Sequence, residues 1–296
     1  MNTQSNSASI VPGAIPTVQL LYWSIRRELM EYRSIYLAPL AIAGVVVAGF
    51  VFVLAHLPQM MRSALALDPS QQGDAISHPF EIAAALIMMA AFIVSVYYAL
   101  DTLYGERRDR SILFWKSLPV SDLTAVIAKA CVLLMVLPAV AFAVTVATEA
   151  VVGLLSIAVL AANGLSVAKF WALTMPFQTL YGLAYHLATV HVLWYAPLYC
   201  WLMLISAWSR RAPLLWAVLP PFAIVVFERV AFHTTYFQDF LQSRATGNGS
   251  SGGMLDPETS LHPFHFMFAP GLWYGLLFAA AFLFVAARLR RYRGPI

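Results

Sequence analysis

The side chains best suited to contact a soluble partner are concentrated in residues 101–122, which read DTLYGERRDRSILFWKSLPVSD. This segment combines charged groups that could form ion pairs with bulky apolar groups that could be buried in a contact. Its sequence predicts a short helix, then a proline turn, then a Ser/Asp start for the next helix. We expect the segment to dock a partner. Its charged members are Asp101, Glu106, Arg107, Arg108, Asp109, Arg110, Lys116 and Asp122, and its apolar members are Ile112, Leu113, Phe114 and Trp115.

Motifs for catalysis and nucleotide binding are absent from the sequence. It contains no GxxxxGK(S/T) loop for nucleotide phosphates, no HExxH, no GxSxG and no CxxC. Its two cysteines, Cys131 and Cys200, lie in apolar segments and are expected to be small buried side chains. We therefore expect that this chain is not an enzyme and that it binds no cofactor or metal.

Histidines leave one alternative open. His262 and His265 have an i, i+3 spacing that could chelate a metal, whereas His186 and His191 lie about 140° apart around a helix. Interfacial or loop histidines without a metal are the commoner case. An intramembrane metal-binding protein or enzyme therefore remains an alternative.

Ionisable residues and prolines within apolar segments form a second candidate set. Glu149 and Glu228 are costly in a membrane, unless they lie at its interface, and such groups are candidates for function. Pro220 and Pro221 are predicted to break their helix, and we place them with Glu149 along a possible translocation path. An ion-coupled secondary transporter is the second alternative, although no internal repeat is visible.

The elements that position these residues are long apolar helices. The chain is 61% hydrophobic and only 11% charged. Its apolar runs of about 20 residues are each long enough to cross a hydrocarbon core of about 30 Å. The alternating pattern of a membrane barrel is absent. The sequence predicts an all-α integral membrane protein with one membrane domain, residues 1–296. Its six expected transmembrane helices are residues 36–57, 80–100, 123–160, 181–208, 212–232 and 269–287.

Basic residues predict the orientation. With the N-terminus in the cytoplasm, all but Arg62, Lys169, Arg229 and Arg244 of the 18 basic residues fall on the cytoplasmic side. Both termini are therefore predicted to be cytoplasmic. The net charge of +4 follows from this bias, so we expect the lipid bilayer as a partner and no nucleic acid.

Three segments fall outside simple crossings. Residues 123–160 would reach about 57 Å as one helix, and we expect one crossing that is kinked near Pro138 and continues outside the membrane from about Glu149. Residues 17–34 predict an amphipathic helix at the interface. Residues 233–268 form the longest expected external loop and include a flexible Gly/Ser tract.

The stretch YYALDTLYGERRDRSILFWKSLPVSD, residues 97–122, resembles permease subunits of type-2 ABC exporters. Similarity at the level of a motif is confined to these residues, and the rest of the chain shares the topology. The resemblance implies a multi-pass permease in the bacterial cytoplasmic membrane. It also implies a separate ATP-binding subunit that holds ATP and Mg, and a homodimer or heterodimer of permeases.

The same resemblance implies roles for the loop, whose central part would be a cytoplasmic coupling helix. Glu106, Arg107, Arg108 and Arg110 would make ionic contacts to the ATP-binding subunit. Phe114 and Trp115 would be the apolar anchors. The chain has no fused ATPase domain and no large folded external domain of the kind found in some exporters. The resemblance therefore implies no particular substrate.

Overall fold

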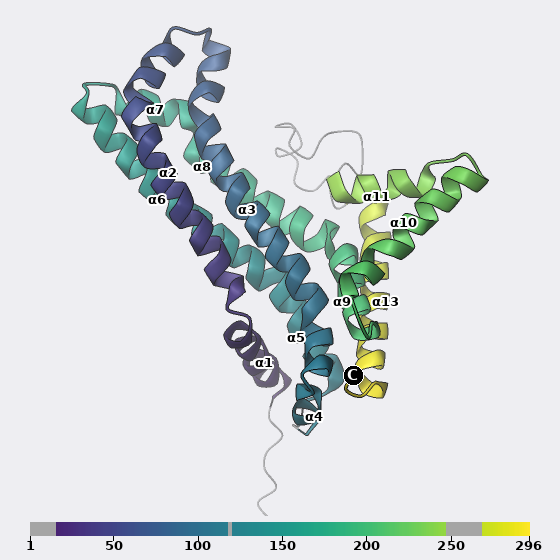
Figure 1. Cartoon of the computed structure of the whole chain (residues 1–296). Coiled ribbons are helices and arrows are strands. Elements are labelled where there is room, and N and C mark those ends of the chain that lie inside the picture. The colour runs from purple at the N-terminus through teal and green to yellow at the C-terminus, as the bar shows by residue number, and fades with distance from the viewer. Residues whose placement is uncertain (1–15, 118–119, 247–267) are drawn as a thin grey trace, which may run out of the picture.

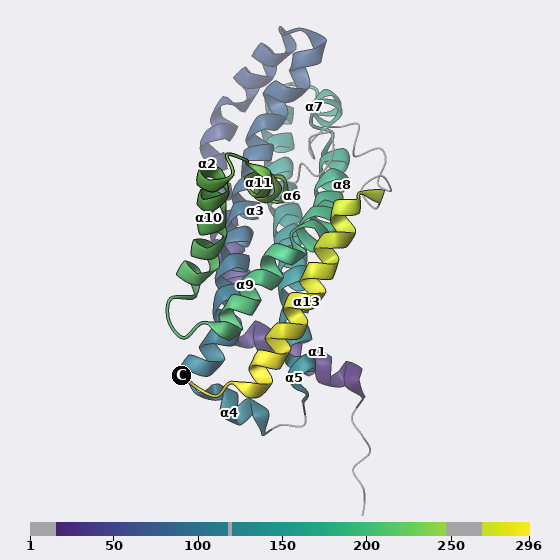
Figure 2. The same cartoon turned by 90° about the vertical axis from the view of Figure 1, so that its right-hand side faces the viewer.

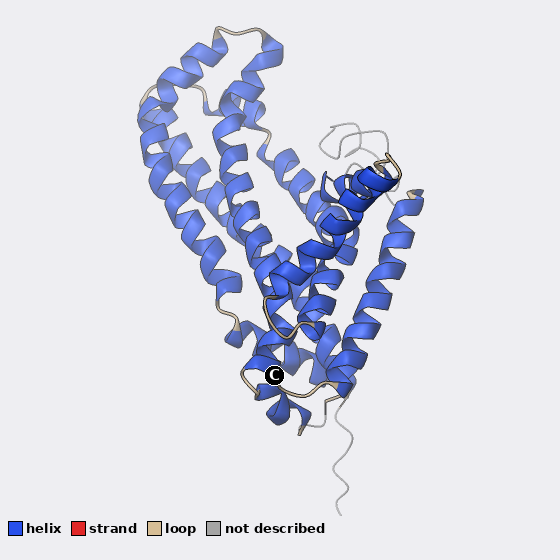
Figure 3. Ribbon diagram, turned by 45° about the vertical axis from the view of Figure 1, so that its right-hand side comes forward, coloured by secondary structure: helices blue, strands red, loops and turns tan. Residues whose placement is uncertain are grey.

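The computed structural model describes residues 16–117, 120–246 and 268–296, and these are helical with short connections (Figure 1). No strand occurs in these ranges, as the uniform helix colour of Figure 3 shows. The helices in chain order are α1 (Thr17–Glu31), α2 (Ser34–Leu65), α3 (Pro69–Arg108), α4 (Ser111–Lys116), α5 (Asp122–Cys131), η1 (Val132–Val136), α6 (Leu137–Ala162), α7 (Val167–Thr174), α8 (Pro176–His186), η2 (Leu187–Trp194), α9 (Ala196–Trp208), α10 (Pro213–Ala231), α11 (Tyr236–Thr246) and α13 (Pro270–Tyr292).

Several of these helices are suited to crossing a membrane. In the described part of the chain five are long and apolar enough: α2, α3, the α5–η1–α6 rod, α10 and α13. A sixth crossing results if the bent pair Val167–Trp194 and Ala196–Trp208, which meet at 48°, counts as one span. The predicted all-α class with long apolar helices is confirmed, and the number of six holds when the bent pair is counted once.

The predicted third span is one continuous rod, Asp122–Ala162, of 41 residues. It includes a π-helical segment, η1, directly before the turn that contains Pro138. Because proline lacks an N–H and crowds the preceding turn, the wider π turn is a way to pass it without ending the helix. The expectation of one continuous rod is therefore confirmed, while the kink expected near Pro138 stays a prediction, and a π-helical segment precedes that proline. The separate short helix α7 follows this rod.

Pro220 and Pro221 do not break α10, so that prediction is wrong. The helix runs through both prolines from Pro213 to Ala231. Pro221 has no N–H to offer the carbonyl of Ala217, four residues earlier. The indole Nε1–H of Trp201 on α9 donates to that carbonyl instead, at 3.2 Å. A side chain from the neighbouring helix thus supplies the hydrogen bond that the proline removes.

The long helices diverge from one end of the molecule. In Figure 1, α2, α6 and the first half of α3 lean to one side, while α10 leans to the other. The end where α1, α4 and the C-terminal residues gather is called the charged end below, and the opposite end the far end. Figure 2 shows α9 running beside the part of α13 nearest the charged end.

The main core lies where the helices converge. It joins α2, α3, η1, α9 and α13 through buried side chains that include Ile35, Tyr98, Leu133, Met203 and Ala286. A second cluster, which includes Leu57, Ile76 and Phe170, joins the far ends of α2 and α3 to α7. Helices α2 and α3 therefore pack against their neighbours both at the charged end and at the far end.

At the far end Arg244 attaches α11 to α13. Its guanidinium lies 4.2 Å from the ring of Trp194 and donates to the backbone carbonyl of Gly271. A Cβ on Gly275 would come within 2.7 Å of the same guanidinium. Glycine at position 275 therefore leaves the space that Arg244 fills.

Candidate functional site at the charged end

Four charged side chains from four different helices are buried together at the charged end. They are Glu28 on α1, Glu106 on α3, Lys129 on α5 and Arg290 on α13, and none is more than 4% exposed. Lys129 Nζ lies 2.8 Å from Glu28 Oε1 and 3.1 Å from Glu106 Oε1. It donates to Glu28 Oε1 and, at 3.0 Å, to Thr102 Oγ1, so the ammonium has two hydrogen bonds and two ion-pair partners.

Glu106 is the centre of this network. One carboxylate oxygen lies 3.1 Å from Lys129 and 3.3 Å from Arg27, and the other lies 3.1 Å from Arg290. Arg290 also pairs with Asp122 at the start of α5. Three cations thus face three carboxylates, which are Glu28, Glu106 and Asp122.

The balance of charge explains how these groups tolerate burial. Removing an ion from water costs several kcal/mol, about as much as a close and fully hydrogen-bonded partner returns. Burial alone would raise the pKa of Glu28, but Lys129 and Arg27 hold that pKa below its usual value. Tyr98 adds a hydrogen bond to the same carboxylate at 3.0 Å. The network therefore fixes α1, α3, α5 and α13 relative to one another.

The short helix α4 is attached to this network through Trp115. The guanidinium of Arg27 lies 4.0 Å from the centre of the Trp115 ring, and Ile112 is fully buried beneath the helix. Leu113 and Phe114 point away, with 59% and 60% of their surface exposed. The helix is thus held by one face and presents two bulky apolar side chains on the other.

Arg107 holds the end of α9. Its Nη1 donates to the carbonyls of Ala207 and Ser209 at 2.7 and 3.0 Å. Carbonyls in the last turn of a helix lack partners within the helix, so a guanidinium there supplies them. The backbone N–H of Ile296 in turn donates to the carbonyl of Arg107 at 3.1 Å. The last turn of α3 is therefore tied both to α9 and to the C-terminal residues.

The predicted docking residues separate into two groups. Glu106 and Arg107 are buried and bound within the chain, so the expectation that they face a partner is corrected. Trp115 is half-buried under Arg27 rather than free to anchor a partner. Arg108, Arg110 and Phe114 are exposed, and their role stays a prediction. Arg108 pairs with Asp109 at 2.9 Å, and this contact lowers the pKa of Asp109.

Ser121 caps the start of α5, and its hydroxyl accepts from the N–H of Thr124 at 3.0 Å. This confirms the predicted helix start. The proline turn expected just before it includes residues 118–119, which lie outside the described residues. Most of the loop expected at 233–268 lies outside them too.

The remaining sequence candidates lie apart from this network. Glu149 is half-buried on α6, and its Oε1 has no hydrogen-bond partner within the described structure. Glu228 accepts from the N–H of Phe237 and the hydroxyl of Thr234, at 2.9 and 3.0 Å, so it holds the turn between α10 and α11. Among described residues no group of three His, Cys, Asp or Glu side chains could hold a metal. His262 and His265 lie outside these residues.

Sequence reasoning missed Glu28, Lys129 and Arg290 as members of one site. The signal was present for Lys129, because a lysine between apolar residues of a membrane helix requires a partner. Its partners could not be identified, since Glu28 lies 101 residues away and Glu106 lies in a separate helix.

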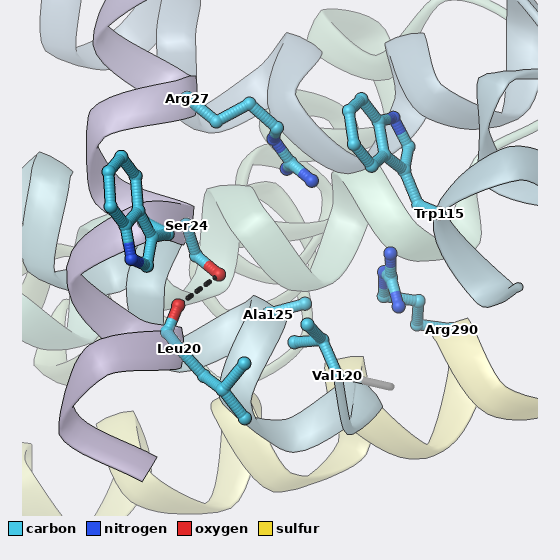
Figure 4. Close-up of a pocket in the computed structure, with 8 residues that line it drawn as sticks. Leu20, Ser24, Arg27, Trp115, Val120, Ala125 and Arg290 are labelled. Atoms are coloured by element: carbon cyan, nitrogen blue, oxygen red, sulfur yellow. Dashed lines mark hydrogen bonds between the residues drawn. The ribbon is translucent and has the colours of Figure 1, made fainter. Parts of the chain in front are cut away.

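A cavity of about 270 Å³ opens beside the network (Figure 4). Helices α1, α4, α5 and α13 surround it, and Figure 4 shows Arg27 and Trp115 extending toward one another across it. Its walls are formed by Leu20, Trp23, Ser24, Arg27, Trp115, Val120, Ala125 and Arg290.

Comparisons with models of protein families, with curated proteins and with solved structures find no match to this chain. The class of protein is therefore defined by the structure alone. It is a helical protein with five or six helices suited to crossing a membrane, joined at one end by a buried network of ion pairs.

Proposed function

We propose that the chain is the permease subunit of an ATP-driven exporter in the bacterial cytoplasmic membrane. In this proposal the charged end lies in the cytoplasm, and a separate ATP-binding subunit docks there. The permease pairs with a second permease, either a copy of itself or a related chain. The chain itself binds no ATP and catalyses no reaction.

The observation that carries the proposal is the way α4 is mounted. Its apolar side chains Leu113 and Phe114 are exposed beside each other, and exposed apolar groups of this kind favour a protein contact. Its other face is tied through Trp115 to Arg27, which joins the ion network. A push on Phe114 would therefore reach α1, α3, α5 and α13 together. This is the mechanical link that a permease without its own ATPase requires.

The test is co-purification with the ATP-binding subunit from native membranes. We expect Phe114→Ser combined with Arg108→Glu to abolish recovery of a P-loop protein while the permease stays folded. Phe177→Ser is the matched control, because Phe177 is 78% exposed at the start of α8. Equal recovery of the P-loop protein with all variants would contradict the docking surface.

A second candidate function rests on Glu149. A half-buried carboxylate without a hydrogen-bond partner suits a site that takes up a proton or another cation. If the chain is an ion-coupled carrier, Glu149→Gln abolishes uptake or efflux in vesicles that lack any ATP-binding subunit. If it is an ABC permease, vesicles without that subunit show no transport, whether position 149 is Glu or Gln.

A further inference from the structure

The cavity beside the ion network has walls of two kinds. Leu20, Trp23, Val120 and Ala125 make one part apolar, and Arg27, Trp115 and Arg290 carry the polar part (Figure 4). Its volume of about 270 Å³ is several times the roughly 30 Å³ that one water occupies. A small polar group with an apolar attachment fits these walls better than water alone.

Two hydrogen-bond donors in these walls lack acceptors. Trp115 Nε1–H and Arg27 Nε–H are both shielded from solvent and have no hydrogen-bond partner in the described structure. The other polar groups are satisfied, since Ser24 donates to the carbonyl of Leu20 at 2.8 Å and Arg290 pairs with Glu106 and Asp122. A shielded donor without an acceptor costs about 1–3 kcal/mol. The cavity therefore calls for a ligand with acceptor oxygens.

The charges near the cavity limit which kind of ligand can supply these acceptor oxygens. Within the buried network Arg27, Lys129 and Arg290 are already matched by Glu28, Glu106 and Asp122, so the network itself leaves no net positive charge for an anion. Glu31, just outside the cavity lining, adds a further carboxylate, whose Oε2 lies 3.9 Å from Arg27 Nε, beyond hydrogen-bond distance. Burial and the neighbouring charge of Glu28 raise the pKa of Glu31, so this carboxylate lacks full compensation. A group that brings both acceptor oxygens and a positive charge suits the site.

The position of the cavity indicates where such a group comes from. Helix α1 exposes Val18, Tyr22, Trp23 and Met30 beside its charged residues. This is the pattern of a helix that lies in a membrane interface, at the depth of lipid head groups. Molecules with phosphate oxygens, a cationic group and apolar chains are abundant at that depth.

We propose that this cavity binds the head group of a zwitterionic glycerophospholipid. The phosphate oxygens accept from Trp115 Nε1–H and Arg27 Nε–H, and the ammonium group lies toward Glu31. The acyl chains extend past Leu20 and Trp23 into the bilayer. The bound lipid joins α1 to α4, and it does so whether or not the chain works with an ATP-binding subunit.

Native mass spectrometry of the full chain in detergent tests the site. The delipidated protein is titrated with phosphatidylethanolamine, with phosphatidylglycerol, with glycerophosphoethanolamine and with inorganic phosphate. We expect one phosphatidylethanolamine to bind at least tenfold more tightly than phosphatidylglycerol. The two soluble probes are expected to bind far more weakly, because they lack the apolar chains. Equal binding of both lipids, or equal binding of inorganic phosphate, would overturn the proposal.

Two substitutions locate the binding. Ala125→Phe fills the cavity and is expected to remove the bound lipid, while Ala150→Phe, on an exposed face of α6, leaves it in place. Trp115→Phe removes one donor and keeps the ring, so we expect about a fivefold loss of affinity. Trp171→Phe is its exposed control. Unchanged lipid affinity in Trp115→Phe would contradict the proposal even if Ala125→Phe fails to fold.

Discussion

Lys129 and Glu28 form a 2.8 Å ion pair, although 101 residues separate them in the sequence. The pair joins the third long rod to the short helix that precedes the first. Both side chains are fully buried, so neither charge can be replaced by water if its partner is lost. The two helices are thus linked by a contact whose loss is costly on either side.

Loss of Lys129 should be strongly destabilising. Lys129→Met removes the cation that lies between Glu28 and Glu106, so two buried carboxylates lose their shared partner. Breaking a buried ion pair from one side costs about 3–5 kcal/mol, and we expect a loss of that size in the free energy of unfolding. Unfolding in detergent, followed by circular dichroism, measures it. Lys169→Met, at an exposed position on α7, should change little, and an equally small effect at Lys129 would contradict the network.

The same network predicts an acid-sensitive stability. The pKa of Glu28 lies below its usual value of 4.5 because Lys129 and Arg27 outweigh the effect of burial. A depressed pKa contributes stability that is fully present above about pH 4.5 and is lost as the pH falls through the lower folded value. We expect the melting temperature to fall on acidification in that window. Glu28→Gln should melt lower at neutral pH and should lose this part of the pH dependence.

Glu31 should change stability with pH in the opposite direction to Glu28. Burial and the charge of Glu28 raise its pKa above 4.5, so the stability that it contributes is present below pH 4.5 and is lost as the pH rises through the higher folded value. Glu31→Gln should therefore raise the melting temperature at pH 7, and the difference should shrink at pH 4. A variant that is less stable at pH 7 would show that the pairing with Arg27 dominates.

The hydrogen bond from Trp201 to the carbonyl of Ala217 predicts that Pro221→Ala restores part of the stability lost in Trp201→Phe. Trp201→Phe removes the donor to the carbonyl that Pro221 leaves without an N–H, and a buried acceptor without a partner costs about 1–3 kcal/mol. Adding Pro221→Ala restores the N–H within α10, so the double variant should recover part of the loss. Unfolding measurements on the two single variants and the double variant form a cycle. Additive effects would show that the two positions are independent.

Substitution by alanine should destabilise the protein at Gly275 and stabilise it at Gly153. At Gly275 the new Cβ would meet the guanidinium of Arg244, which must leave its contacts with Trp194 and Gly271, at a cost of about 1–3 kcal/mol. At Gly153 nothing lies within 4 Å, so alanine should stabilise α6 by up to about 1 kcal/mol. Thermal unfolding of both variants checks the pair. Arg244→Ala should remove the penalty at Gly275.

The sequence predicts the helices far better than it predicts the network. Runs of apolar residues with few charges indicate membrane helices such as α2 because length and hydropathy are local properties. The partners of Lys129 come from helices that are distant in the sequence, and only their packing brings Glu28, Glu106 and Arg290 together. The resemblance to exporter permeases implies a partner contact for Glu106, which requires an exposed side chain, whereas the structure buries it. Its burial depends on cations supplied by three other helices.

The prediction at Pro220 and Pro221 failed for a related reason. A proline within a helix loses one hydrogen bond, and on the sequence alone that loss predicts the end of the helix. Trp201 replaces the lost bond from a neighbouring helix, and its position relative to Ala217 is set by how α9 and α10 pack. Tertiary contacts therefore decided the outcome at this site.

The π segment η1 changes what a deletion would do to the third rod. In an ordinary α-helix the loss of one residue rotates everything beyond it by about 100°, so buried side chains would turn toward lipid. A π turn holds an additional residue, and removing one of Val132–Val136 can convert it to an α turn while the helix on either side keeps its facing. The rod can thus shorten by one residue at this place without losing the alignment of Lys129 at one end and Leu160 at the other.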